Sequence, residues 1–459
     1  SDLGGVKANE FAYVTSGSAI HRVEVLGRQD TGELRAQETQ VVATCESGVV
    51  SRLTDSGWEQ LAPAAGVDAF EPGAGVRPWS FEMYGRHYFG GPDDYRVWDP
   101  RVGQVREWTP GENSLIPPRI FTAVRWRGRA IVVSEDDRHV LYGSAFGEPT
   151  DFQTGGETVT ATQAFAGTTA ATGAIPDPIT ALMPSTDDLR DVGTNRSVWR
   201  ITGDPQTGGQ LDDVLASEGV VAENAWCRGD AGEMYWMTTG RRVVQLGSSG
   251  MVDISSTSIR GRLQRIDPEE YRVELIFSDR EQGVYVLFVP RSGTPEKDLE
   301  HLFWSKRSQR WHPVQYAGGI DRAVTAAAVL ENADAGGWGA LLGFADGFLR
   351  FVHPEALDDD GVPIASRLRV PVTGDGDPQR GMIQFAELVL DEAQGPVRVV
   401  GVAGRTGSTG DDYGQETVVQ PGRGDGVHVG VAGSHTWLEV IGTGEPWAID
   451  SMAVDVHLW

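Results

Sequence analysis

Two stretches of this chain combine carboxylates with glycines in an order that could bind a metal ion or a nucleotide. The run Asp358-Asp359-Asp360-Gly361 sets three adjacent carboxylates before a glycine, and such a group could bind calcium. The spaced ligands of a recognised calcium loop are missing, so the run favours a solvated linker. A second stretch, Gly374-Asp375-Gly376, comes near the fingerprint of a dinucleotide-binding loop. Residue 379 is Gln, however, and no βαβ unit surrounds the stretch, so the fingerprint fails.

Glycoside hydrolysis is another chemistry to consider, because it needs a pair of carboxylates. The run Thr54-Asp55-Ser56-Gly57-Trp58 approaches the Asp box of sialidases, SxDxGxTW. Asp55 is too close to the glycine, the Thr before the Trp is absent, and the pattern does not recur along the chain. The motifs GxSxG, GxxxxGK(S/T) and HExxH are also absent. We therefore predict that the chain has no catalytic residues and is not an enzyme.

The cysteines and histidines do not form a recognisable metal motif. Cys45 and Cys227 lie in different parts of the repeat described below, so buried free thiols are expected rather than a disulfide framework. The nine histidines are scattered singly, and no Cys or His pair has zinc-ligand spacing. The sequence thus predicts no metal site and no cofactor.

A repeated unit organises the chain around these residues. Between Ile179 and Leu246, one pattern occurs twice: strand, Gly/Asp-rich turn, strand, tight turn, strand. The tight turns are Thr194-Asn195-Arg196 and Thr239-Gly240-Arg241. Asn and Gly are expected to supply the positive φ that such turns need.

The second strand, turn and third strand of this unit recur about seven times, at a spacing of roughly 50 residues. The copies begin at Val42, His87, Ala130, Asp191, Glu233, Val284 and Ala340. Small sheets repeated at this interval favour a β-propeller. A generic β-sandwich is the alternative, but its strands need not repeat at fixed intervals.

Further strands complete the predicted blades. An outer fourth strand is visible near Leu61, Trp108 and Trp311, and Phe11–Val25 predicts a strand pair that could close the ring against the last blade. The segment Asp253–Glu270 is expected to be a connector with a short helix. The blades are predicted at residues 40–61, 78–110 and 121–153, in two units between 179 and 246, and at 271–316 and 323–353.

Two segments differ in composition from the blades. Thr154–Pro178 is rich in Thr, Ala and Gly, which predicts an inserted loop or extended hairpin that meets a neighbouring subunit, or else a disordered connection. From Ile364 to Trp459 the strands alternate regularly between Gly/Asp turns, as in an antiparallel β-sandwich. The predicted fold is therefore all-β: a propeller over residues 1–357 with an insertion at 154–178, then a β-sandwich over 362–459.

The negative net charge of the chain limits the kinds of molecule that it is expected to bind. The net charge of −26 predicts a surface that repels phosphates and does not hold DNA by non-specific contacts, although solubility alone would also explain it. No run approaches the ~20 apolar residues of a membrane span. The first residues show no signal-peptide pattern.

Four stretches of the chain together resemble a known family. One motif is Tyr142-Gly143-Ser144 through Asp151-Phe152, and a second runs from Thr194 to Gly203 with the pattern T..svWri.G. A third covers Gly219 to Leu246, and the final strand is WAIDSMAVDVHLW. These motifs resemble the nozzle proteins of short-tailed bacteriophages, which include the DNA-stabilisation and tail-tubular proteins. The resemblance extends from about residue 80 and describes blade packing rather than chemistry.

The resemblance implies a structural subunit of the phage tail, located in the virion. A closed homo-oligomeric ring of about six copies would lie below the portal and adaptor and contact other tail proteins. Its acidic conduit would retain and release the genome without binding DNA specifically. The alternative is a monomeric propeller that binds a glycan or protein at the mouth of its channel, and a glycan-cleaving enzyme is a third possibility.

Overall fold

The structure is nearly all-β. The computed structural model describes residues 6–13, 20–26, 40–54, 57–72, 76–111, 114–155, 160–167, 175–184, 189–207, 209–215, 217–248, 250–255, 259–291, 300–316, 323–332, 337–352, 358–359, 362–363, 365–372, 381–390, 396–404, 411–413, 416–420, 424–433, 435–443 and 449–458. The chain divides into two compact units, of which one is Ala8–Val352 and the other comprises Ser1–Lys7 with His353–Trp459.

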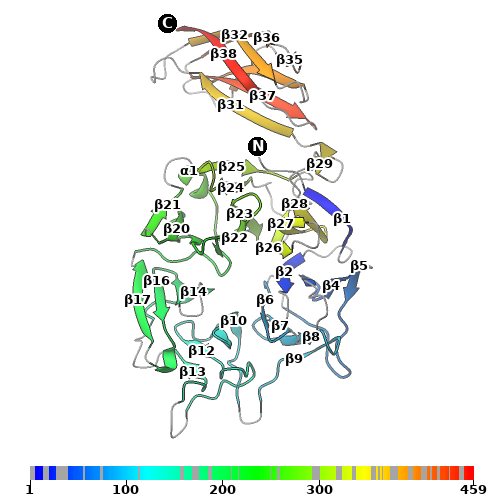
Figure 1. Cartoon of the computed structure of the whole chain (residues 1–459), viewed down its shortest axis with the longest axis vertical. Coiled ribbons are helices and arrows are strands. Elements are labelled where there is room, and N and C mark those ends of the chain that lie inside the picture. The colour runs from blue at the N-terminus through cyan, green and yellow to red at the C-terminus, as the bar shows by residue number, and fades with distance from the viewer. Residues whose placement is uncertain are drawn as a thin grey trace. The chain divides into compact units, whose positions relative to one another are not determined.

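The larger unit is a β-propeller. It contains seven four-stranded antiparallel sheets, and Figure 1 shows them arranged around a central axis. Blades 1 to 3, from the innermost strand outward, are β2 (Ile20–Leu26), β3 (Gln40–Cys45), β4 (Val50–Thr54), β5 (Gly57–Gln60); β6 (Trp79–Met83), β7 (Arg86–Gly90), β8 (Tyr95–Asp99), β9 (Gln104–Glu107); and β10 (Ile120–Trp126), β11 (Arg129–Ser134), β12 (Leu141–Gly143), β13 (Phe165–Ala166).

The remaining blades follow the same order. Blades 4 to 7 are β14 (Ile179–Pro184), β15 (Leu189–Thr194), β16 (Val198–Thr202), β17 (Gln210–Leu215); β18 (Trp226–Arg228), β19 (Met234–Met237), β20 (Val243–Gly247), β21 (Gly250–Asp253); β22 (Tyr271–Ser278), β23 (Gly283–Pro290), β24 (His301–Ser305), β25 (Arg310–Val314); and β26 (Val324–Asn332), β27 (Gly337–Phe344), β28 (Phe348–Val352), β1 (Val6–Tyr13). The connections include a 3-10 turn, η1 (Pro205–Thr207), and one helical turn, α1 (Arg260–Leu263). This helical turn confirms the short helix predicted between blades 5 and 6.

Alternating apolar residues explain why the sheets pack face to face. On β3, Val41 and Ala43 pack in a cluster with Ala326 of blade 7. The intervening Val42 packs on the opposite face, in a cluster with Trp98 of blade 2. Because successive side chains of a strand point to opposite faces, each blade presents an apolar surface to both neighbours. The main apolar cores therefore lie between blades.

The repeated hairpins are confirmed, because the copies predicted from sequence correspond to the second and third strands of the seven sheets. The strand that closes the ring is also confirmed: β1 pairs with β28 as the outer strand of blade 7. The predicted first blade, residues 40–61, lacked its innermost strand. That strand is β2, which pairs with β3 and belonged to the predicted pair Phe11–Val25.

The prediction for residues 154–178 was wrong in part. Within this segment, β13 pairs with β12 and completes blade 3. Phe165 is 3% exposed, so a single aromatic side chain anchors a segment with few other apolar residues. The buried Arg129 donates hydrogen bonds to the carbonyl oxygens of Ser144 (2.6 Å), Gln163 (2.7 Å) and Ala161. Side-chain bonds of this kind hold residues 160–165 against the blade.

The positive φ predicted for the two tight turns was also wrong, because neither Asn195 nor Gly240 has it. In the turn between β19 and β20, the residue with positive φ is Arg241 (58°) and not Gly240. Gly240 is needed for space, because a Cβ atom there would lie 2.6 Å from the carboxylate of Glu218. Glu218 pairs with Arg242 at 2.9 Å, so the glycine admits an ion pair across the turn.

The smaller unit is a two-sheet β-sandwich. One sheet contains β31 (Ala365–Val372), β37 (His435–Thr443), β33 (Val397–Gly404), β34 (Asp411–Tyr413) and β35 (Thr417–Val419); the other contains β36 (Gly424–Gly433), β32 (Gly381–Leu390) and β38 (Ile449–Leu458). Strands β33 and β36 bring the two sheets into contact. Val399, Val402 and Val440 are fully buried in this unit. The short β34 and β35 were not predicted.

Two smaller predictions can also be compared with the structure. Cys45 and Cys227 are buried free thiols, as predicted, and burial raises the pKa of Cys45 to about 12. In the acidic linker, β29 (Asp358–Asp359) pairs with β30 (Val362–Pro363), while residues 360 and 361 lie outside the described residues.

Candidate functional site

The candidate site is a cavity on the propeller axis, at the end of the channel where the innermost strands begin. Its walls come from β2, β6, β10, β14 and the connection that leads into β18. We call it the axial cavity, and its volume is about 70 Å³. Ligand pockets usually enclose about 300–1,000 Å³, so this cavity holds only a very small molecule.

An ion pair crosses the axis beside the cavity. Arg77, just before β6 in blade 2, donates a hydrogen bond from Nη2 to Oε1 of Glu274 on β22 in blade 6. Each side chain is only 4% exposed. A buried pair of this kind gains little net stability over apolar residues, but loss of one partner leaves an uncompensated charge. The pair therefore ties two distant blades together.

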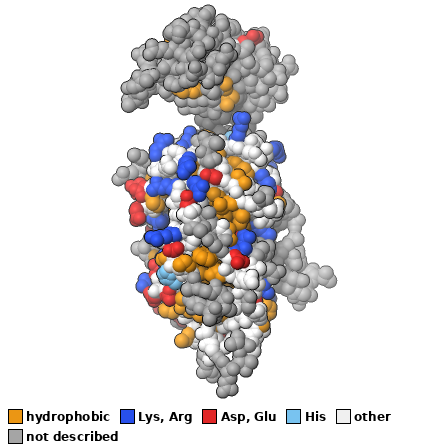
Figure 2. All heavy atoms as spheres, turned by 90° about the vertical axis from the view of Figure 1, so that its left-hand side faces the viewer, with side chains coloured by type: hydrophobic (Ala, Val, Ile, Leu, Met, Phe, Trp, Pro, Cys, Tyr) orange, Lys and Arg blue, Asp and Glu red, His pale blue; other side chains and the backbone are white. Residues whose placement is uncertain are grey.

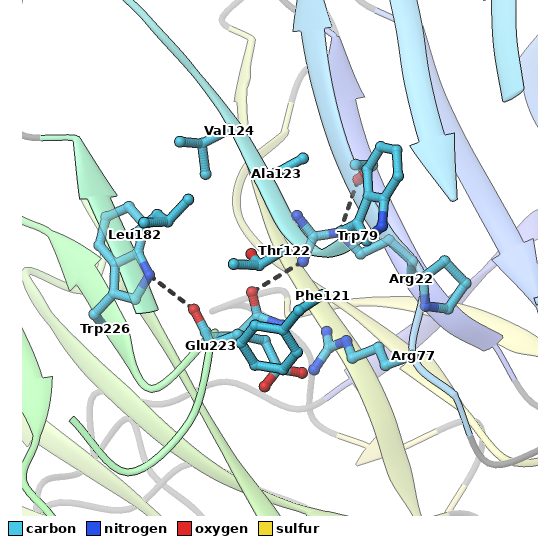
Figure 3. A pocket seen from close by; sticks show the side chains of 13 residues that line it. Arg22, Arg77, Trp79, Phe121, Thr122, Ala123, Val124, Leu182, Glu223 and Trp226 are labelled. Atoms are coloured by element: carbon cyan, nitrogen blue, oxygen red, sulfur yellow. Dashed lines mark hydrogen bonds between the residues drawn. The ribbon is translucent and has the colours of Figure 1, made fainter. Parts of the chain in front are cut away.

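A second polar link crosses the axis from blade 1. Arg22 on β2 donates from Nε to Oγ of Ser80 on β6 at 2.8 Å. Its Nη1 donates to Oδ1 of Asn224, in the connection before β18, at 3.1 Å. Figure 3 shows Arg22 among the side chains that line the cavity. The guanidinium of Arg22 is thus held at a fixed place by partners from two other blades.

The rest of the wall is aromatic and apolar. The indole of Trp226 donates from Nε1 to the backbone oxygen of Glu223 at 2.9 Å, and Trp79 donates to the oxygen of Ile120 at 3.2 Å. Leu182 and Val124 line the cavity between them. With both indole nitrogens bonded to backbone, the rings present apolar surface to the cavity.

Arginines and one buried histidine lie near the axis. Burial, the larger cause, and the charge of Arg22 together lower the pKa of His87 on β7 to about 3. Burial also lowers the pKa of Arg272 on β22; Glu223 opposes this shift and Arg77 adds to it. His87 is therefore neutral at physiological pH.

The sequence did not predict this site. Glu274 lies in the largely apolar strand YRVELIFS, and a carboxylate in a buried strand was the available signal. Arg22 and Arg77 gave no signal, because their relation to the axis depends on ring closure.

Within the described residues, no group of three or more His, Cys, Asp or Glu side chains is placed to hold a metal ion. None of the helices in that part of the chain is long and apolar enough to cross a membrane.

Residues of the first two motifs of the family resemblance lie in packing positions, whereas Glu223, Asn224 and Trp226 of the third motif line the axial cavity. The Oγ of Ser144 accepts the backbone N–H of Ala130 at 3.0 Å. Phe152 packs edge-on against Trp108, with 6.1 Å between ring centroids. In the second motif, Oγ1 of Thr194 accepts the N–H of Ser197 at 2.9 Å. These contacts stabilise blades 2 to 4 and are outside the axial cavity.

Comparisons with known proteins bear on the fold. No described protein family matches the sequence, and no curated protein does. The extracellular domain BT4673 of B. thetaiotaomicron, described as part of a one-component system, has a TM-score of 0.50 at 11% identity. The alignment covers 92% of this chain but 47% of that structure, so this chain spans about half its length.

Two other solved structures are less similar. The extracellular domain BT3049 of B. thetaiotaomicron, described as part of a hybrid two-component system, has a TM-score of 0.47 at 8% identity; the alignment covers 90% of this chain and 47% of that one. The computationally designed Ika8 protein has a TM-score of 0.42 at 15% identity, over 74% of this chain and 99% of that one. At these identities, the similarity of BT4673 supports the β-propeller fold and nothing further.

Proposed function

We propose that this chain is a rigid, non-catalytic scaffold that works by binding other proteins on its outer surfaces. The observation that supports this proposal is that side chains from opposite blades bond to one another across the propeller axis. The Arg77–Glu274 pair and the link from Arg22 to Asn224 cross the channel, where ligand-binding propellers commonly hold their ligands. Because these side chains connect opposite blades across the channel, we expect the propeller to resist deformation.

The outer surface of the propeller carries exposed apolar side chains that could contact other proteins. On β21, the outer edge strand of blade 5, Met251 is 40% and Val252 is 52% exposed. Figure 2 shows apolar, basic and acidic side chains mixed on the side of the molecule that includes this blade. Mixed surfaces with an apolar centre are typical of protein–protein interfaces.

More specifically, we propose that the scaffold is a subunit of a short-tailed phage nozzle. The family resemblance supports this assignment, since residues of its first two motifs occupy the blade-packing positions that a shared fold would preserve. About six copies would form a closed ring with head-to-tail interfaces. A net charge of −26 suits a conduit that must let DNA slide, because it offers few contacts that neutralise phosphates.

A second candidate function is a monomeric binding module. The axial cavity, with its arginines and indoles, favours it, and BT4673 and BT3049 are described as extracellular domains. The small volume of about 70 Å³ argues against a glycan as the ligand. A tight, saturable ligand on a protein that stays monomeric at all concentrations would support this candidate over the scaffold.

Light scattering on the purified full chain tests the scaffold proposal. We expect a particle of several copies whose mass is constant over a broad concentration range. A protein that remains monomeric at about 100 μM, where even weak oligomers with micromolar dissociation constants associate, would contradict the ring.

A matched pair of variants sharpens this test. Val252→Glu places a charge on an exposed edge strand, and we expect it to reduce the assembled mass. Val102→Glu adds the same charge in the turn between β8 and β9, where Val102 is 45% exposed, and should leave the mass unchanged. Equal effects of both variants would exclude β21 as the contact.

A further inference from the structure

The axial cavity brings two guanidinium groups to one small, partly open space. Arg22 and Arg77 both line it, and they come from different blades. Ser80 and Asn224 fix the guanidinium of Arg22, while Glu274 holds Nη2 of Arg77. Since protein contacts fix both groups in advance, a ligand would meet an already ordered site.

One donor in this wall has no acceptor. The Nε atom of Arg77 is buried and has no hydrogen-bond partner, although the side chain as a whole is only 4% exposed. In Figure 3 the side chain reaches toward Phe121 and Glu223 within the cavity. The Nε atoms of other arginines, Arg96 and Arg129 among them, are also buried without a partner. That of Arg77 is the one in a residue that lines the cavity, where it is available to donate to an oxygen of a bound molecule.

The charges around the cavity favour an anion. Arg22, Arg77 and Arg272 bring three positive charges, and Glu223 and Glu274 bring two negative charges. Burial, the largest cause, and the charge of Arg22 lower the pKa of His87, which lies outside the cavity wall. A site with excess positive charge inside a protein of net charge −26 is unlike the rest of the chain.

The size of the cavity limits the ligand further. Its volume of about 70 Å³ is well below the usual range of ligand pockets, so it suits a few waters or one small oxyanion. Guanidinium groups match the planar fork of a carboxylate and the oxygens of a phosphate. Trp226 and Leu182 would close the apolar side of such a ligand.

We propose that the axial cavity binds one small oxyanion, a free carboxylate or phosphate, between Arg22 and Arg77. The anion accepts a hydrogen bond from Nε of Arg77 and lies in the field of both guanidinium groups. This site is independent of the proposed scaffold function, since its ligand touches only the propeller axis of a single chain.

Isothermal titration of the full chain with sodium acetate and with sodium phosphate, at constant ionic strength, tests the proposal. We expect saturable binding of one anion per chain for at least one of the two. Acetate alone would identify a carboxylate site, phosphate alone a phosphate site, and both a general oxyanion site. No saturable binding of either anion up to about 50 mM, a dissociation constant beyond the weakest specific affinities, would overturn it.

Two variants with the same change in net charge separate the site from the general field. Asn224→Asp puts a carboxylate on the partner of Arg22, keeps the hydrogen-bond acceptor, and should weaken anion binding at least tenfold. Asn195→Asp makes the same substitution at an exposed turn and should change affinity less than twofold. Equal affinities for Asn224→Asp and wild type would overturn the proposal.

The circular dichroism spectrum shows whether Asn224→Asp retains its fold. If that variant does not fold, Arg22→Gln removes one guanidinium charge while keeping a donor toward Ser80 and Asn224. The expected loss of affinity is again at least tenfold, and unchanged affinity would again count against the site.

Discussion

The propeller is held together differently between its blades and along its axis. Between blades the contacts are apolar and extensive, as in the cluster around Trp236, which is fully buried among blades 4 to 6. Along the axis the contacts are few, polar and buried, with Arg77 and Glu274 joining blades 2 and 6. The apolar surfaces between blades supply most of the stability. The polar bonds on the axis specify which blades lie opposite one another in the ring.

The largest expected effect lies in the apolar interface. Trp236→Ala removes a large side chain from a closed core, and we expect a loss of about 4 kcal/mol in the free energy of unfolding of the propeller. Chemical denaturation measures this loss. Phe146→Ala removes an aromatic ring that is 56% exposed and should cost less than about 0.5 kcal/mol. Similar losses in both variants would mean that the interface is not the main source of stability.

The next largest effect is expected on the axis. Arg77→Met leaves Glu274 buried without its partner and should destabilise the propeller by about 3 kcal/mol. Adding Glu274→Leu should recover most of that loss, because an apolar pair of similar volume needs no compensation. The same denaturation curves measure both variants. A double variant no more stable than the single one would show that the ion pair itself provides the stability.

A smaller and more local effect is expected in blade 3. Arg129→Met removes the hydrogen bonds that hold residues 160–165 and should cost about 2 kcal/mol. Limited proteolysis should then cut within residues 154–178 faster than in the wild type. Arg125→Met changes an exposed arginine on the neighbouring strand and serves as the control. Unchanged cleavage in Arg129→Met would show that β13 alone anchors the segment.

The last expected effect appears only as the pH is lowered. Burial lowers the pKa of His301 to about 4, below its ordinary value of 6.5, so the unfolded chain binds a proton that the folded chain does not. Stability is complete above about pH 6.5 and is lost as the pH falls toward 4. His301→Asn keeps an acceptor for the N–H of Phe288, and it should reduce this slope by about 1.4 kcal/mol per pH unit. Identical slopes would assign the acid sensitivity to other groups.

Local pattern was enough to predict most of the fold. The hairpins of the seven blades recur in sequence because each must present apolar side chains to two neighbouring sheets, and that demand is the same in every blade. The closing strand and the C-terminal sandwich follow from the same alternation of apolar and polar residues. These predictions did not require knowing where each blade lies in the ring.

The features that the sequence did not predict depend on contacts between residues far apart in the chain. The strand β13 was missed because Phe165 is its one large apolar residue, and its hold on the blade comes from Arg129, more than thirty residues earlier. The axial cavity was missed because Arg77 and Glu274 are 197 positions apart. At Gly240, the need for space near Glu218 could not be separated from a need for positive φ.

Electron cryo-microscopy of the assembled full chain tests the central proposal most directly. We predict a closed ring of about six copies whose lumen is lined mainly by Asp and Glu side chains, since a conduit for DNA should not bind phosphates. Single copies under all conditions, or a ring with a neutral or basic lumen, would contradict the account.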